Sequence, residues 1–489
     1  MRTKGFDDVV LGGGPAGCVL AARLSEDPDR AVCLVEAGPD YGPLAGGRWP
    51  ADLIDPHQLP VSHDWCHDDG FGWSARVMGG CSTHNACLLT WGAAADYDGW
   101  GHGWSAAALE PYRTRAEEAI GCGPRAEPGA WHDAVHAAAV EAGFAPLADL
   151  NARDAVTGVG RAPFNDRDGV RRNAAIAYLD GARGRSNLTI VARALADRLD
   201  LDGTRVRGAW VVRDRRRILI EAGRTLLCAG AYGSPAILLR SGIGPSGELR
   251  RHGIRPAVDL PGVGENLQNH WTARAMVEPG RELRRRVAAE IAAGGVNMAG
   301  TVVKAASSRC EPGLWDLHLF SVAWAIRDEA ARPTGEYVFR IATSVLHPRS
   351  MGRVTISSPD PDAAPVIDHR PLSDPDGADL AVLADGVGDA ARIASAPSLR
   401  GLGAILEAPT ATDEPALRAH AIASLGCYYH PVGTCAIGSV VDGIGRVYGV
   451  DGAYVADCSV MPTTPRANTH LSALAVAERL ADLLRADAA

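Results

Sequence analysis

The sequence is poor in lysine and has no stripe of positive charge. Two of its 49 basic residues are lysines, Lys4 and Lys304, and the formal net charge is -9. Proteins that bind nucleic acid usually present clustered cationic side chains that neutralise phosphates. We therefore expect no nucleic-acid partner.

The sequence also lacks a long apolar run. The run over residues 9–22 is interrupted by Gly12-Gly13-Gly14-Pro15 and is shorter than the roughly 18 apolar residues that a membrane-spanning helix needs. Asp7 and Asp8 precede this run, which is not typical of a secretory signal. Neither export nor a membrane anchor is expected.

No cysteine pattern indicates a disulfide framework or a metal site. The 11 cysteines are scattered from Cys18 to Cys458 and form no CxxC pair and no Cys/His cluster with metal-ligand spacing. We expect a reduced, cytoplasmic chain with no bound metal ion.

Glycine and proline are abundant, with 56 and 31 among 489 residues, although the composition stays within the globular range. A chain of this length is too long for one ordinary core, so two large domains are expected. No tandem repeat and no low-complexity linker is present, which favours domains that are interleaved along the chain.

The start of the chain predicts a strand, a glycine turn, a helix and a second strand. The first strand covers Phe6 to Leu11, the turn covers Gly12 to Gly17, the helix continues to Leu24, and the second strand runs from Ala31 to Glu36. This order is the opening of a βαβ unit.

The turn matches the GxGxxG pattern of dinucleotide-binding proteins. Gly12 permits a tight turn, Gly14 lets the backbone approach a pyrophosphate at the helix N-terminus, and Gly17 permits close packing. Glu36, at the end of the second strand, is placed to accept a hydrogen bond from a ribose hydroxyl. The pattern predicts a dinucleotide site but does not distinguish FAD from NAD.

Later segments predict a second sheet and a closing helix. Residues 315–323, 337–347 and 352–357 are rich in Val, Ile, Phe and Thr and are separated by turn residues, which indicates antiparallel strands. The tail from Thr469 to Leu484 has helical apolar spacing, with Thr469 as the predicted N-cap.

Several separated motifs carry a family resemblance. They are residues 76–85 (RVMGGCSTHN), 230–244 (GAYGSP to SGIG), 429–435 (YHPVGTC) and 455–457 (VAD), followed by Asn468. In this order and spacing they resemble the glucose-methanol-choline (GMC) family of FAD-dependent oxidoreductases. The resemblance runs from residue 6 to 484 and thins between residues 270 and 420.

The resemblance implies an α/β fold with two domains. One is a Rossmann-type FAD-binding domain, and the other is a smaller α+β substrate domain built on an antiparallel sheet. We expect residues 1–145, 185–295 and 427–489 to form the FAD-binding domain. Residues 146–184 and 296–426 would form the substrate domain.

The resemblance also implies FAD as the cofactor. Asp457 would bind the pyrophosphate or ribityl chain, and Ala196 would touch the adenine. The helix after Asn468 would direct its N-terminal amides at the flavin, where a helix dipole stabilises negative charge. The full set implied to contact FAD is Gly12, Gly14, Gly17, Glu36, Gly79, Gly80, His84, Asn85, Ala196, Asp457, Asn468 and Thr469.

By the same resemblance, His430 is the catalytic base. Alcohol oxidation requires loss of the hydroxyl proton as a hydride leaves the carbon, and a neutral imidazole accepts a proton near pH 7. Asn468 would bind the substrate oxygen, although it could instead cap the last helix. His347 would help to position the oxygen, whereas His270, which follows Asn269 where the family usually has Asp, is expected to be structural.

Within the family, the loop around His84 is most similar to that of choline oxidases, where the matching histidine is bonded covalently to FAD. We therefore expect a bond from a His84 imidazole nitrogen to the 8-methyl group of the flavin. His347 also matches an active-site histidine of those enzymes. However, Ala86 and Met298 stand where they have a Ser and a Glu, so a neutral alcohol is expected to be a better substrate than choline.

The electron acceptor stays open at this point. Electrons could pass to oxygen, giving hydrogen peroxide, or to another acceptor in a dehydrogenase. A lyase with a redox-silent flavin and a flavin-binding protein without turnover are further alternatives. The expected enzyme is a monomer or homodimer that acts on a small-molecule alcohol, which the sequence does not identify.

Overall fold

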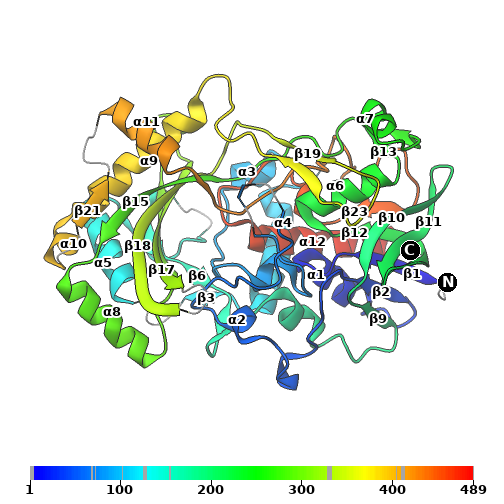
Figure 1. The fold of residues 1–489 in the computed structure, drawn as a ribbon, viewed down its shortest axis with the longest axis horizontal. Coiled ribbons are helices and arrows are strands. Elements are labelled where there is room, and N and C mark those ends of the chain that lie inside the picture. Colours follow the sequence, from blue (N-terminus) through cyan, green and yellow to red (C-terminus); the bar gives the residue numbers. More distant parts are fainter. Residues whose placement is uncertain are drawn as a thin grey trace.

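Two sheets, one toward each end of the molecule, organise the fold (Figure 1). The computed structural model describes residues 5–67, 70–71, 73–101, 103–124, 129–152, 156–327, 333–402, 405–408 and 413–487. Within these residues, no helix is both long enough and apolar enough to cross a membrane.

The first sheet is built around the predicted βαβ opening. β1 (Phe6–Leu11) pairs in parallel with β2 (Val32–Val35) and with β12 (Arg216–Leu227), and α1 (Pro15–Leu24) connects β1 to β2. The predicted first strand and helix are confirmed, and the second strand is one residue shorter at each end than predicted.

Segments that are distant in sequence complete this sheet. Its order is β10-β11-β12-β1-β2-β9, and β23 pairs with β12. The added strands are β9 (Leu188–Val191), β10 (Leu195–Asp202), β11 (Arg205–Arg213) and β23 (Ala453–Val455).

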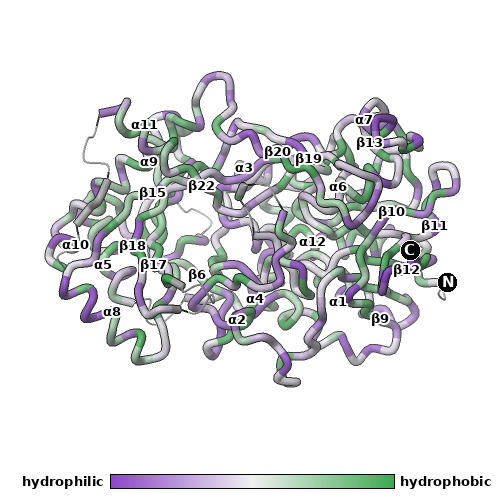
Figure 2. The backbone as a smooth tube through the Cα atoms, in the orientation of Figure 1, coloured by the Kyte–Doolittle hydropathy of each residue, from purple (hydrophilic) through white to green (hydrophobic). Residues whose placement is uncertain are grey.

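Helices cover the first sheet and bury its strands. α12 (Thr469–Ala486) packs against α1 and α4 (Ala106–Ile120), and α6 (Gly230–Arg240) packs against β10. In Figure 2 the hydrophobic segments (green) concentrate inside both halves, and hydrophilic residues (purple) are frequent on outer helices such as α7 (Ser246–Arg251).

The second sheet is mainly antiparallel, as predicted, and has the order β21-β15-β18-β17-β16-β5-β4, with β22 pairing with β15. Its strands are β4 (Pro146–Leu147), β5 (Gly158–Arg161), β15 (Trp271–Glu278), β16 (Ala299–Ala305), β17 (Leu317–Arg327), β18 (Pro333–Val345), β21 (Ile405–Ala408) and β22 (Gly426–Cys427). The predicted strand at 352–357 is β19 (Arg353–Ile356), which pairs with β20 (Pro365–Asp368) outside this sheet.

Helices surround the second sheet in the left half of Figure 1. They are α5 (Ala130–Glu141), α8 (Arg281–Ala293), α9 (Ala378–Ala394), α10 (Pro397–Gly401) and α11 (Glu414–Ala423). The shorter helices and strands are α2 (Ala51–Ile54), α3 (Ala94–Asp98), β3 (Gly123–Pro124), β6 (Pro163–Phe164), β7 (Asp166–Arg167), β8 (Val170–Arg171), β13 (Ile243–Gly244) and β14 (Val258–Asp259).

The predicted domain limit at residue 295 does not coincide with the change from one sheet to the other. β15 and α8 lie within the range assigned to the FAD-binding domain, but β15 pairs with β18 in the second sheet. Leu283 and Val287 of α8 pack into the apolar core of that sheet because they form its buried stripe. The change of sheet therefore occurs near residue 270, and α5, within the predicted range 1–145, packs into the same core. The domain limits themselves stay predictions.

The predicted N-cap of the last helix is also corrected. α12 begins at Thr469, and Asn468 occupies the N-cap position because its backbone is extended, with φ -62° and ψ 132°.

Candidate active site

The glycine turn after β1 has the close contacts that its pattern predicts. Gly12 has φ +111°, and a Cβ atom there would lie 2.4 Å from the carbonyl oxygen of Cys228. A Cβ on Gly17 would lie 1.8 Å from the oxygen of Gly12. Both positions require glycine, and the turn leads into the N-terminus of α1, where backbone amides favour an anion.

Glu36 lies directly beside this turn. Its carboxylate accepts hydrogen bonds from Gly13 N at 2.8 Å and from Gly38 N at 2.7 Å. Burial raises the pKa of Glu36 to about 7, although these backbone amides lower it in part. Ala194 N donates to the Glu36 carbonyl at 2.9 Å, and the predicted adenine contact Ala196 follows two residues later, at the start of β10.

The loop that carries the second predicted motif lies against the first turn. Gly79 N donates to Gly13 O at 2.7 Å, and a Cβ on Gly80 would lie 2.6 Å from the Cα of Gly14. The Asn85 amide nitrogen lies 3.0 Å from His470 Nδ1. The structure thus places Gly79, Gly80 and Asn85 between the glycine turn and the start of α12.

His84 follows the short helical turn of this loop, and its side chain is buried. Neither ring nitrogen makes a hydrogen bond of ordinary geometry. Burial, followed by the nearby Arg171 guanidinium, lowers the pKa of His84 to about 4. The imidazole is therefore neutral at pH 7 and has an unshared electron pair.

Asp457 follows β23 and connects it to α6. Its Oδ2 accepts hydrogen bonds from Gly230 N at 2.8 Å and Ser234 Oγ at 2.6 Å, and its Oδ1 accepts one from Ser459 N at 2.8 Å. The predicted hydrogen bond from FAD to Asp457 would therefore be made to oxygens that already accept these three hydrogen bonds. Burial raises the pKa of Asp457.

Two of the three predicted catalytic residues meet. His430 and Asn468 are both buried, and His430 Nε2 lies 3.4 Å from Asn468 Nδ2. His347 makes no hydrogen bond to either of them within the described residues. Its side chain is exposed, and the strongest nearby charges are those of Arg466 and Asp96.

His270 contacts His430, which differs from the purely structural role that the sequence suggested. The two Nδ1 atoms lie 2.9 Å apart, and His270 Nε2 lies 3.0 Å from Leu346 O. Because a carbonyl oxygen only accepts, His270 Nε2 carries the proton and its Nδ1 is an acceptor. His430 must then donate from Nδ1, which leaves the Nε2 electron pair facing Asn468.

The orientation of Asn468 follows from its contacts with Thr90. Asn468 N donates to Thr90 Oγ1 at 2.9 Å, and the Thr90 hydroxyl donates to Asn468 Oδ1 at 2.7 Å. The amide NH₂ group therefore faces His430. Although Asn468 is the N-cap residue of α12, its side chain accepts no hydrogen bond from the helix, so its side chain does not act as the cap.

The surroundings keep both histidines neutral. Burial lowers the pKa of His430 well below its ordinary value, and the charges of His270 and His318 would lower it further. Burial lowers the pKa of His270 to about 3. His430 is therefore ready to accept a proton at neutral pH.

Three aromatic residues near His430 were missed by sequence reasoning. Phe320 of β17 stacks on Tyr428 with a centroid separation of 4.4 Å, and the Tyr428 ring lies 4.4 Å from that of His430. His318, two residues before Phe320, is buried with neither ring nitrogen hydrogen-bonded. The signal was the alternation of side chains along β17, which places His318 and Phe320 on one face.

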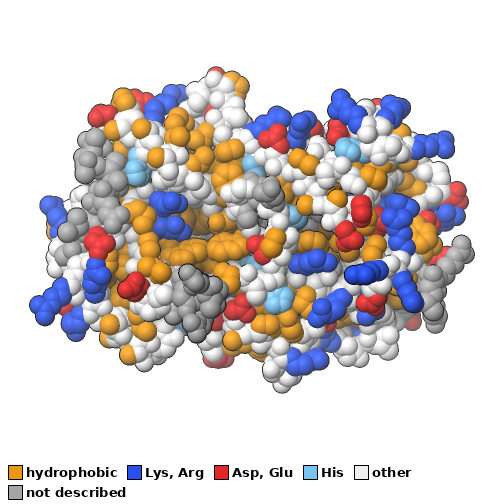
Figure 3. All heavy atoms as spheres, viewed as in Figure 1, with side chains coloured by type: hydrophobic (Ala, Val, Ile, Leu, Met, Phe, Trp, Pro, Cys, Tyr) orange, Lys and Arg blue, Asp and Glu red, His pale blue; other side chains and the backbone are white. Residues whose placement is uncertain are grey.

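A cavity of about 460 Å³ lies beside Tyr429, the neighbour of His430. Tyr429 has φ +64°, so the backbone turns and exposes its side chain, whereas His430 is buried. The hollow seen near the middle of the face in Figure 3 has hydrophobic side chains (orange) and cationic ones (blue). The residues that line the cavity are Asp64, Phe71, Trp73, Trp324, Val338, Arg340 and Tyr429.

A second cavity, of about 360 Å³, shares Trp324 with the first. Met298 is among its lining residues. Met298 and Ala86 pack against the apolar cluster that contains Phe320. Both positions that argued against choline are therefore near the candidate active site.

The described residues fit a flavin dinucleotide better than a metal ion. They contain no group of three or more side chains that could hold a metal ion. The glycine turn permits close approach of a pyrophosphate. His84, and His470 through its Nε2, also keep buried ring nitrogens without hydrogen bonds in this region.

Comparison with family models identifies two matching regions. Residues 6–272 match the N-terminal model of GMC oxidoreductases, and residues 348–477 match the C-terminal model. Together these regions cover most of the chain.

Individual proteins are similar over the same length. An uncharacterised GMC-type oxidoreductase of Mycobacterium tuberculosis is 35% identical, with 98% of this chain and 99% of that protein covered. Choline oxidase of Arthrobacter globiformis is 32% identical, with 99% and 95% covered. The crystal structure of pyridoxine 4-oxidase from Mesorbium loti superimposes with a TM-score of 0.85 at 27% identity, with 99% of each chain covered.

Proposed function

The chain belongs to the GMC family of FAD-dependent alcohol oxidoreductases, and on that premise we propose that it is an oxidase in which His430 is the general base. The observation that carries this proposal is the hydrogen-bond pattern through Leu346, His270 and His430. It leaves the Nε2 electron pair of His430 directed at the Asn468 amide. A substrate hydroxyl that binds between them would meet a base and a hydrogen-bond donor together.

FAD held at the glycine turn and beside Glu36 and Asp457 would supply the hydride acceptor for the carbinol carbon. His430 Nε2 takes the hydroxyl proton, and the Asn468 amide donates a hydrogen bond to the substrate oxygen, where negative charge develops. His270 Nδ1 accepts the hydrogen bond from His430 Nδ1 and so stabilises the imidazolium that forms. His347 is proposed only to position the substrate, because it lies outside this hydrogen-bonded group.

Oxygen is the proposed electron acceptor, with hydrogen peroxide as the product. A dehydrogenase that uses another acceptor is the alternative, since it would differ only in the second half-reaction. A lyase on the same fold would use His430 without net oxidation. The proposed location is the cytoplasm, and the proposed state is a monomer or homodimer.

An alcohol panel tests the proposal. Neutral primary and secondary alcohols and choline would be mixed anaerobically with the purified flavoprotein. At least one neutral alcohol should bleach the flavin absorbance, peroxide should appear when oxygen is admitted, and choline should be the poorer substrate. Dye reduction without peroxide would favour the dehydrogenase, and carbonyl release without bleaching would favour the lyase.

We also propose that His84 holds FAD covalently. The support is a buried, neutral imidazole whose nitrogens make no hydrogen bond of ordinary geometry, in a loop that lies against the glycine turn. A nitrogen–carbon bond would replace one N–H and one C–H bond, and the two protons and two electrons lost would pass to oxygen.

Mass measurement after acid denaturation tests this attachment. The protein mass should exceed that of the chain by FAD less two hydrogen atoms, and His84→Ala should remove this increase while FAD remains bound in the native state. Colour found wholly in the supernatant, with an unchanged protein mass, would refute the attachment.

A further inference from the structure

The wall of the 460 Å³ cavity contains an arginine. Arg340 lies on β18, and its Nε atom is buried without a hydrogen bond. Within the described residues no carboxylate forms an ion pair with it. Burial lowers the pKa of Arg340, and the neighbouring charge of Arg274 adds to this effect. Arg340 is half-buried, and an anionic ligand in the cavity would replace the hydration that its guanidinium loses there.

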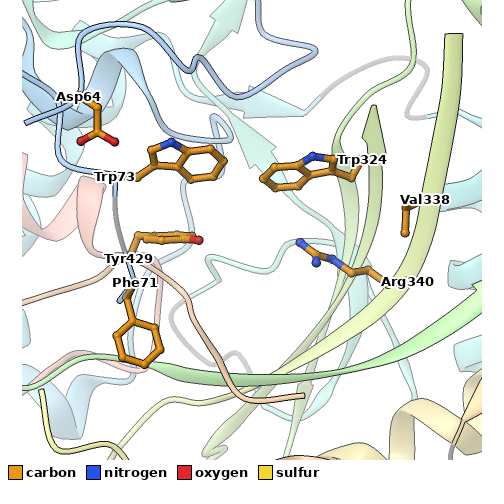
Figure 4. A pocket seen from close by; sticks show the side chains of 7 residues that line it. All are labelled: Asp64, Phe71, Trp73, Trp324, Val338, Arg340 and Tyr429. Carbon is orange, nitrogen blue, oxygen red and sulfur yellow. The ribbon is translucent and has the colours of Figure 1, made fainter. Parts of the chain in front are cut away.

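Stacking on Trp324 does not replace this hydration. The Arg340 Cζ atom lies 5.3 Å from the centroid of the Trp324 ring, so the ring contacts the guanidinium face. The N–H groups lie in the guanidinium plane, so stacking leaves them able to donate to a ligand in the cavity. In Figure 4 the guanidinium nitrogens of Arg340 point into the space between Trp324 and Tyr429.

Asp64, which also lines the cavity, does not neutralise Arg340. Its Oδ1 atom accepts hydrogen bonds from Cys66 N and Ser74 N, both at 3.1 Å. Figure 4 shows Asp64 beyond Trp73, on the side away from Arg340. The carboxylate thus stabilises its own loop.

Strand register relates Arg340 to the catalytic pair. Arg340 is opposite Val322, one alternate position along β17 from Phe320. Phe320 stacks on Tyr428, whose ring contacts His430. Two residues along a strand span about 7 Å, so Arg340 lies on the same face of the sheet as Phe320 and one alternate position from it.

We propose that Arg340 binds a carboxylate of the substrate, so that the enzyme prefers aromatic alcohols that carry an acid group across the ring from the hydroxymethyl group. This inference rests on the proposed function, since it names the substrate class of the same site. The planar guanidinium matches a carboxylate, and Phe71, Trp73 and Trp324 provide an aromatic wall for the ring. The same positive charge repels choline.

The test compares an acid with its neutral ester. Anaerobic flavin reduction would give kcat/KM for 4-(hydroxymethyl)benzoate and for its methyl ester. We expect the acid to be preferred by about 10-fold or more, and Arg340→Met to lower the acid-to-ester ratio by about 10- to 100-fold, since charged hydrogen bonds have this effect. Arg340→Lys should restore part of the ratio, and Arg216→Met, in the exposed β11–β12 hairpin, should leave it unchanged.

If Arg340→Met does not fold, a binding measurement on the wild-type protein still tests the proposal. Calorimetry with the wild-type flavoprotein should show that 4-methylbenzoate, which cannot be oxidised at a hydroxyl group, binds at least about 10-fold more tightly than 4-methylbenzamide. Equal binding would overturn the proposal, as would an acid preference that survives Arg340→Met. If neutral alcohols reduce the flavin but the acid has no advantage, this inference fails alone. If no alcohol reduces the flavin, the proposed function itself fails.

Discussion

His430 is the residue on which the proposed chemistry depends most. His430→Ala should lower the rate of flavin reduction by about 10²- to 10⁴-fold while FAD stays bound, because a general base usually contributes that much. Rapid-mixing absorbance measurements would give this rate. Because the surroundings lower the pKa of His430, the wild-type rate should stay level above neutral pH and fall only in acid, as the base becomes protonated. A variant within a few-fold of wild type would assign the base elsewhere.

Single residues also show which contacts could not be predicted from the sequence. His430 and Asn468 were predicted because they lie in motifs. The contact between His270 and His430 joins residues 160 positions apart, so no local pattern could reveal it. Arg340 likewise resembles any other arginine of a strand until the cavity around it is known. The sequence shows which residue types are present, but the partners of His270 and Arg340 depend on tertiary packing.

At the scale of elements, α12 begins at Thr469, and this start places its N-cap residue Asn468 beside His430. Asn468→Ala should slow flavin reduction less than His430→Ala, because one oriented hydrogen bond to a developing oxyanion contributes about 3 to 4 kcal/mol at most. No capping hydrogen bond is lost, but the buried Thr90 hydroxyl loses its acceptor, so the free energy of unfolding should fall by about 1 to 3 kcal/mol. Ser105→Ala is the matched control, because Ser105 does cap α4 and its loss should lower stability without slowing flavin reduction. Unfolding of the Asn468 variant with unaltered turnover would contradict the proposed role.

The elements that the sequence predicted well are those with local signals. β1, α1 and β2 follow from alternation, a glycine turn and helical spacing within one short segment. The domain limit near residue 295 stays a prediction, because membership of a sheet depends on pairing with distant strands that the sequence does not show. β15 reads as an ordinary alternating strand, and only its pairing with β18 assigns it to the second sheet.

For the whole molecule, buried neutral histidines make stability depend on pH. His84 and His270 have folded-state pKa values of about 4 and about 3, both below the ordinary value of 6.5. The unfolded chain therefore binds more protons below about pH 6.5, and the free energy of unfolding falls as the pH drops through that window. Between about pH 7.5 and 5 each histidine contributes about 2 kcal/mol of this loss.

Denaturant unfolding at these two pH values would measure the effect, with flavin content held constant. His270→Leu should reduce the pH dependence by the share of one histidine, because a leucine takes up no proton on unfolding. His252→Leu, at the end of α7, is the control, since His252 is partly exposed and contacts Glu248. Equal pH dependence in the wild type and in the His270 variant would mean that the pKa of His270 is not lowered by folding, so that His270 is protonated in the folded protein at pH 5. A protonated His270 could not accept the hydrogen bond from His430 Nδ1, so the same measurement tests the direction of the hydrogen bonds on which the assignment of the base rests.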